Sequence, residues 1–136
     1  MKGLYALLVA LALASAACKK DDNTPTTPTV TSKTETFTGT VQVKSFAIHN
    51  FTVEQAGQVS VTLTAASPPA TIAMGIAVGT PANGACGVLQ GASTTTAAGT
   101  TAQLTGVVSP GMLCVQISDV GNQTAAVTYT VTVTHP

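Results

Sequence analysis

Three cysteines carry the most specific chemistry in this chain of 136 residues. Cys18 follows an apolar N-terminal segment, whereas Cys86 and Cys114 lie in a region rich in threonine and valine. A thiol can form a disulfide, ligate a metal or accept a covalent group, and its surroundings decide among these. An odd number leaves one cysteine over if the other two pair. Pairing of Cys86 with Cys114 would leave Cys18 for a different role.

The segment before Cys18 has the pattern of an export signal. Lys2 supplies the positive charge, Leu4 to Leu13 are apolar, and small residues follow. The apolar stretch is about 14 residues, fewer than the roughly 20 that a spanning helix needs. Residues 1–17 are therefore predicted to be a lipoprotein signal peptide. Cleavage at Ala14-Ser15-Ala16 is the alternative, and it would leave a soluble exported chain.

Two short motifs around Cys18 indicate what becomes of it. Ser15-Ala16-Ala17-Cys18 resembles a bacterial lipobox, which implies that the thiol carries a diacylglyceryl group and anchors the chain in a membrane. Lys19-Lys20-Asp21-Asp22 resembles the surface-export signal of Bacteroidota-type lipoproteins. The resemblance implies a surface-exposed outer-membrane lipoprotein of the bacterial cell envelope. A periplasmic or secreted protein is the alternative.

Residues 18–34 are expected to combine this anchor with a disordered Thr/Pro linker. Pro25 and Pro28 favour extended backbone, and almost nothing apolar is available for burial. At about 3.1 Å per residue, some 14 residues would span roughly 40 Å.

Residues 35–136 are predicted to form one all-β domain. Apolar and polar residues alternate with period two, as in Val59 to Thr64 and Val127 to Thr134, and turn-forming residues separate these runs. About eight antiparallel strands at this spacing predict a single jelly-roll-like β-sandwich. The expected strands are 35–43, 46–54, 58–66, 71–79, 85–90, 101–108, 112–118 and 126–134.

This region resembles the bacterial pre-peptidase C-terminal (PPC) domains, which are small jelly-roll sandwiches of exported proteins. The resemblance rests on three segments. His49 to Val53 precedes Ala56-Gly57-Gln58-Val59, like the family's F-x-V and aG-x-V motifs. Ser109-Pro110-Gly111 opens a run like p-x-G-x-Y-x-V, and Tyr129 to Val133 resembles the closing Y-x-L-x-V. It implies a PPC-like β-sandwich.

Cys86 and Cys114 are expected to form a disulfide between the fifth and seventh strands, because an exported chain meets an oxidising compartment. Closing the loop would stabilise the fold by about 3–4 kcal/mol. Cys114 alternates with Leu113 and Val115, so the bridge should lie on the outer side of a sheet or at an edge. Two free buried thiols are the alternative.

Charge is too sparse to indicate a catalytic or nucleic-acid site. The domain has no arginine and no cluster of lysines, which excludes a nucleic-acid partner. His49 and Asp119 are the only pair that could assist a hydroxyl nucleophile, and no catalytic motif accompanies them. Asp119 with Val120, Gly121 and Asn122 could make a poor calcium site, but an Asx-type turn is favoured. Neither metal nor cofactor is expected.

The composition therefore favours a protein that is not an enzyme. We expect a structural or adhesion/interaction module of the cell envelope, with the membrane and an extracellular glycan or protein as partners. The alternative is a glycan- or peptide-binding module of a surface uptake or degradation system. It predicts a concave loop patch with clustered Asn and Gln and an exposed Phe46, since Phe37, Phe51 and Tyr129 fall in phase with the core. A smooth threonine-covered surface would argue against it.

Overall fold

The computed structural model describes residues 24–136, which form eight β-strands and no helix. The first four strands are β1 (Lys33–Val41), β2 (Phe46–Val53), β3 (Gly57–Ser67) and β4 (Met74–Ala82). The other four are β5 (Ala85–Thr96), β6 (Leu104–Val108), β7 (Gly111–Ser118) and β8 (Val127–His135). The predicted all-β class with eight strands is confirmed. Alternating burial along β1 and β8 reflects side chains that point in turn to the two faces of a sheet.

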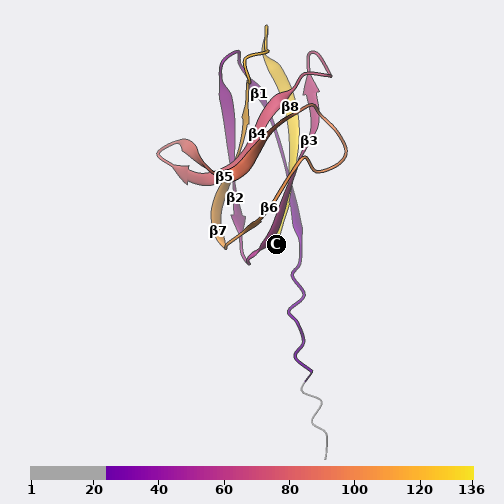
Figure 1. Cartoon of the computed structure of the whole chain (residues 1–136), viewed down its shortest axis with the longest axis vertical. Helices are drawn as coiled ribbons and strands as arrows, with labels where there is room; N and C mark the ends of the chain where they lie inside the picture. The colour runs from indigo at the N-terminus through magenta and orange to yellow at the C-terminus, as the bar shows by residue number, and fades with distance from the viewer. Residues whose placement is uncertain (1–23) are drawn as a thin grey trace, which may run out of the picture.

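The strands form two four-stranded antiparallel sheets (Figure 1). Sheet A has the order β1-β8-β3-β6, and sheet B has the order β2-β7-β4-β5. Successive strands pass from one sheet to the other except between β4 and β5, which form a hairpin. This order is that of a jelly roll, as predicted. In Figure 1, residues 24–32 leave the lower end of the sandwich beside the C-terminus.

The core fills the space between the sheets, and both sheets contribute to it. Its largest fully buried side chains are Leu63, Met74, Ile76, Ile117, Val41, Val53, Val61, Val115, Val127, Val131 and Val133. Phe51 and Tyr129 are 3% exposed, and Phe37 packs against the core, as predicted from their phase. Phe46 lies outside the core with 53% of its surface exposed.

The ends of β1 and the start of β4 differ by two or three residues from the prediction. β1 begins at Lys33 instead of residue 35, because its pairing with β8 extends to Lys33 opposite His135. It ends before a tight turn in which Ser45 donates to the Gln42 carbonyl. β4 begins at Met74 instead of residue 71, because a turn that follows Pro69 occupies the preceding residues.

β5 runs to Thr96, although the sequence pattern predicted its end at residue 90. Its pairing with β4 stops at Val88 and resumes at Ser93. Residues 89–92 bulge between these points, and Gly91 takes a positive φ of 75° there. The predicted end therefore coincides with a bulge, after which the strand continues. At its other end, β5 begins after Asn83-Gly84, a two-residue hairpin turn in which both residues have positive φ.

β6 is shorter than predicted, because a side chain takes over part of its pairing with β3. The backbone ladder between them ends where Val61 faces Leu104. Beyond it, Gln103 Oε1 accepts from the Leu63 N–H at 2.8 Å, and Nε2 donates to the Leu63 carbonyl at 3.2 Å. The amide of Gln103 thus continues the ladder in place of another strand residue.

Candidate functional site

Cys86 and Cys114 form the predicted disulfide, with a Cα–Cα distance of 5.9 Å. Cys114 is fully buried, although it lies opposite Gly79 on the outer side of sheet B. Its neighbours Leu113 and Val115 point into the core. β5 and β7 are not adjacent, because β4 lies between them. The disulfide therefore crosses β4 on the outer face of the sheet.

This crossing depends on a close approach of β5 to β4. A Cβ atom on Gly79 would overlap the carbonyl oxygen of Gly87 and lie 2.9 Å from the Cα atom of Val88. The backbone of β5 thus rests on a strand position that has no side chain. The sequence predicted which cysteines pair, but it gave no signal of this contact.

The predicted anchor Cys18 lies outside the described residues, as do the lipobox and Lys19 to Asp22. Residues 24–32 are described, and they are exposed and form no strand. We call residues 24–32 the tether. The end of the sandwich that they join, at Lys33, is called the tether end.

His49 of β2 and Tyr129 of β8 form a polar bridge between the sheets. His49 Nε2 and the Tyr129 hydroxyl are 2.7 Å apart, and the ring of Phe37 stacks on the imidazole with a centroid distance of 4.8 Å. Burial lowers the pKa of His49 and raises the pKa of Tyr129. Gly39 allows the contact, because a Cβ there would overlap the tyrosine hydroxyl. His49 thus has a packing role.

Asp119 forms the predicted Asx-type turn. Its Oδ2 accepts from the Lys44 N–H at 2.7 Å, and its Oδ1 accepts from the N–H groups of Gly121 and Asn122 at 2.8 and 3.2 Å. These backbone hydrogen bonds, led by the one from Lys44, lower the pKa of Asp119. Among the described residues, no hydrogen bond joins Asp119 to His49, and each has partners of its own.

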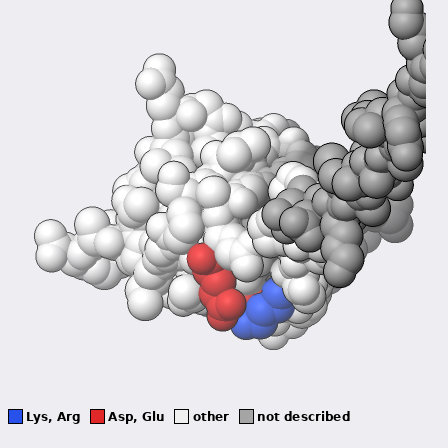
Figure 2. Space-filling view, turned by 90° about the horizontal axis from the view of Figure 1, so that it is seen from below, with Lys and Arg blue, Asp and Glu red and all other residues white. Residues whose placement is uncertain are grey.

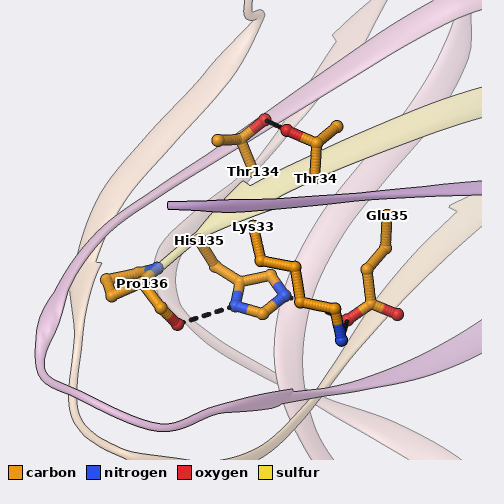
Figure 3. Close-up of polar contacts among 6 residues, drawn as sticks. All are labelled: Lys33, Thr34, Glu35, Thr134, His135 and Pro136. Carbon is orange, nitrogen blue, oxygen red and sulfur yellow. Dashed lines mark hydrogen bonds and ion pairs between the residues drawn. The ribbon is translucent and has the colours of Figure 1, made fainter. Parts of the chain in front are cut away.

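Charged side chains at the tether end form a small cluster (Figure 3). Glu35 lies 3.2 Å from Lys33 Nζ and accepts from His135 Nε2 at 3.0 Å. The hydrogen bond from His135 is the main cause that lowers the pKa of Glu35, and Lys33 adds to it. His135 is only 1% exposed and packs on the ring of Phe51. Figure 2, seen from this end, shows acidic and basic atoms side by side on an otherwise uncharged surface.

The outer face of sheet A is covered with threonine. Thr34, Thr36, Thr38 and Thr40 of β1 lie directly opposite Thr134, Thr132, Thr130 and Thr128 of β8. Several of these hydroxyls are already paired. Thr34 and Thr134 share a hydrogen bond of 2.9 Å (Figure 3), and Thr128 donates to the carbonyl of Ser67 at 3.1 Å. This face is covered with threonine but is not smooth, because a hollow of about 400 Å³ lies over Ala65, Ser67, Thr128 and Thr130.

The outer face of sheet B has a groove of about 460 Å³ over β4. Its floor includes Gly75 and Ala77, which point outward between the core residues of that strand. Val88 and Val120 line the same groove with 45% and 44% of their surfaces exposed. Hollows of similar volume lie on the outer face of sheet A, at about 400 Å³, and at the tether end, at about 350 Å³.

Four uncharged polar residues flank the floor in two rows. Ser93 of β5 and Gln116 of β7 both lie opposite Ala77. Thr95 of β5 and Ser118 of β7 both lie opposite Gly75. In the described part of the chain, none of these four side chains hydrogen-bonds to another residue, and the same holds for the hydroxyls of Thr36, Thr38 and Thr40 on sheet A.

Phe46 borders this groove. It is on β2 and lies opposite Ser118, which lines the groove on the neighbouring strand. The exposed ring and the amide of Gln116 are thus on one face, but the groove lies on strands instead of loops, and among the described residues Gln116 is the only amide side chain that lines it. The sequence analysis singled out Phe46 but missed the groove residues. The outward run Gly75, Ala77, Gly79 was the available signal, because small residues let neighbouring groups approach the strand, as Ser118 and Val120 do at Gly75 and the backbone of β5 does at Gly79.

No protein-family model matches the chain, and no curated protein matches it. Within residues 24–136, no helix is long and apolar enough to cross a membrane. The same residues contain no group of three His, Cys, Asp or Glu side chains arranged as metal ligands. In the described chain, the groove on sheet B offers unpaired polar groups beside exposed apolar ones. A cleft of about 250 Å³ between β5 and β6 does so too, with Gln90 and Thr105 beside the exposed Leu89 and Val107.

Proposed function

We propose that the chain is an exported, lipid-anchored protein of the bacterial cell envelope, and that its β-sandwich is a non-enzymatic adhesion or interaction module. The position of the groove relative to the tether carries this proposal. The tether joins β1 at Lys33, and β1 ends at Val41, a short turn before Phe46. Phe46 lies opposite Ser118 at the groove. The groove therefore lies toward the end of the sandwich that points away from the tether.

The sequence around Cys18 supports the anchor. Its lipobox-like motif would attach the chain to a membrane, and two or three acyl chains would hold it stably, whereas one would hold it only marginally. The basic and acidic residues that follow favour the outer face of an outer membrane. The resemblance to PPC domains, which are jelly rolls of exported proteins, agrees with this location.

The anchor is tested by the variant Cys18→Ala. The wild-type protein should fractionate with membranes, and its intact mass should correspond to an acylated chain that begins at Cys18. The variant should be released into the soluble fraction. A matched control is the double variant Cys86→Ala/Cys114→Ala, which should stay with the membranes because it keeps Cys18. Recovery of an unacylated wild-type chain cut near Ala16 would contradict the anchor.

The interaction role is tested on whole cells. Cells that carry the wild-type chain should attach to one another or to a coated surface more strongly than cells that lack it. External protease should also remove the sandwich from intact cells. Equal attachment with and without the protein would contradict the proposal, even if the anchor is present.

A second candidate function is a glycan- or peptide-binding module of a surface uptake or degradation system. The observation that favours it is the same groove, with Gln116 and the exposed Phe46 on one face. Both candidates place recognition on the outer face of sheet B, and they differ in what happens to the bound molecule.

A further inference from the structure

We propose that the groove over Gly75 and Ala77 binds a neutral oligosaccharide. This inference rests on the proposed function, because it names the ligand class of the face that the tether presents. It is carried by the two rows of unpaired polar side chains, the exposed apolar groups beside them and the lack of charge.

The two rows give the groove a repeat. Ser93, Ala77 and Gln116 form one row across three strands, and Thr95, Gly75 and Ser118 form the next. Rows two residues apart along a strand are separated by about 7 Å. A groove with a repeated set of polar groups suits a chain molecule with repeated polar groups better than a single compact ligand.

The polar groups are of the kind that sugars require. A serine or threonine hydroxyl both donates and accepts, and the amide of Gln116 offers a donor and an acceptor. Sugar hydroxyls have the same double capacity. Since the protein leaves these side chains without internal partners, a bound sugar would replace water there and break no hydrogen bond of the fold.

Apolar groups beside the rows match the other part of a sugar ring. Val88 and Val120 are exposed at the groove, and Phe46 is exposed opposite Ser118. The carbon-bound hydrogens of a pyranose form apolar patches between its hydroxyls. An aromatic ring and branched aliphatic side chains can cover such patches while the hydroxyls meet the polar rows.

The charge of the face indicates that the ligand is neutral. None of the residues that line the groove is ionisable. The charged residues of the sandwich lie at its ends, as the Lys33–Glu35 pair and the Lys44–Asp119 contact show. A carboxylate or sulfate that entered the groove would lose water without gaining a cation, which is unfavourable.

The pairing of β4 argues against an extended peptide. Peptides that bind to sheets usually add a strand at a free edge, where their backbone meets unpaired N–H and C=O groups. β4 is paired with β5 on one side and with β7 on the other. The groove therefore offers side-chain groups, and a peptide backbone would find no ladder to extend.

The test uses the full-length protein purified from membranes in detergent. Isothermal titration would measure its affinity for neutral hexasaccharides of β-1,4-linked glucose, xylose, mannose and N-acetylglucosamine. An acidic oligogalacturonate and an uncharged Gly/Ser/Thr peptide would be titrated in parallel. We expect binding of at least one neutral hexasaccharide and of neither comparison ligand.

Two variants locate the site. Ser93→Trp fills the groove from an exposed position and should weaken binding by about tenfold or more, whereas Gln116→Ala should weaken it about three- to tenfold, the loss of one good hydrogen bond. Thr36→Trp is the matched control, because Thr36 is exposed on the edge strand of sheet A. It should leave the affinity within about twofold of wild type.

Three outcomes would overturn the inference. The first is that none of the four neutral sugars binds. The second is that the peptide or the acidic sugar binds more tightly than the neutral sugars. The third is that Ser93→Trp and Thr36→Trp weaken sugar binding equally. In each case the attachment of cells remains a separate measurement. Attachment without sugar binding would reject the ligand and keep the interaction module, whereas loss of both would reject the proposed function as well.

Discussion

The outer faces of the two sheets have the same alternating pattern but different surfaces. On sheet A, nine continuous residue pairs join β1 to β8, and threonine faces threonine in the four pairs that point outward. On sheet B, the pairing of β4 with β5 is interrupted at residues 89–92. The outward positions of β4 there hold Gly75, Ala77 and Gly79. Both faces have a hollow, and they differ in what lies beside it: Val88 and Val120 are exposed at the groove of sheet B, whereas the hollow of sheet A is lined mainly by threonine.

This difference has an energetic side. Threonine is β-branched and favours a strand, so a threonine-covered face is both soluble and intrinsically stable. Glycine destabilises a strand for two reasons. It loses more conformational entropy on folding than other residues, and it has no side chain to pack against its neighbours. Glycines occur in strands of both sheets, such as Gly39 and Gly106 in sheet A and Gly75 and Gly79 in sheet B, whereas the disulfide crosses sheet B.

Removal of the disulfide should have the largest effect. The double variant Cys86→Ala/Cys114→Ala should lower the free energy of unfolding by about 3–4 kcal/mol, because the unfolded chain is no longer closed into a loop. Denaturant unfolding of the purified wild-type and variant proteins measures this difference in the free energy of unfolding. Reduction of the wild-type protein should give a similar loss and should not affect the variant. A loss below about 1 kcal/mol would mean that sheet B does not depend on its disulfide.

Filling the contact between β4 and β5 should have the next largest effect. Gly79→Ala should destabilise the fold by about 1–3 kcal/mol, since the new Cβ would overlap backbone atoms that cannot move alone. The matched control is Gly106→Ala in β6 of sheet A, where a Cβ would meet nothing within 4 Å. It should leave the stability unchanged or raise it by up to about 1 kcal/mol. Equal effects would remove the distinction between the sheets.

Gln103 provides a test on sheet A. Gln103→Ala should lower the free energy of unfolding by about 1–3 kcal/mol, because the backbone groups of Leu63 would lose the amide that pairs with them. Gln58→Ala is the control, since Gln58 is an exposed residue of β3 and should change stability by less than about 0.5 kcal/mol. If the two variants unfold alike, water replaces the amide of Gln103 at no cost.

These examples show what the sequence could and could not predict. The period-two pattern located all eight strands, because it resides in residue type and spacing. The export signal identified the disulfide, because it places Cys86 and Cys114 in an oxidising compartment. The bulge at residues 89–92 could not be predicted, since it depends on how β5 packs on Gly79. The groove could not be predicted either, because its rows bring together Ser93, Ala77 and Gln116 from three strands. Such neighbours are set by the register of the sheets.

The bridge between the sheets should respond to pH. Burial holds the pKa of His49 below its ordinary value of about 6.5, so at lower pH the unfolded chain binds a proton that the folded chain does not. This contribution to stability is complete above about pH 6.5 and is lost as the pH falls toward the folded pKa. Wild-type protein should therefore lose more stability than His49→Phe between about pH 7.5 and about pH 5.5.

The comparison of the two proteins isolates His49, because Glu35, Asp119 and His135 are present in both. Thermal unfolding at each pH measures the difference. Parallel pH profiles would contradict the prediction and would mean that His49 takes up its proton equally in the folded and unfolded chain.

The threonine ladder of sheet A should respond least to substitution. Thr34→Val removes a hydroxyl that pairs with Thr134 at the surface, and it should change the free energy of unfolding by less than about 0.5 kcal/mol. Valine favours strands as threonine does, and water can satisfy the remaining hydroxyl. The double variant Thr34→Val/Thr134→Val tests whether the ladder acts as a network. A loss above about 1 kcal/mol in either variant would show cooperative hydroxyl pairing, and sheet A would then owe its stability to its outer face as well as to the core.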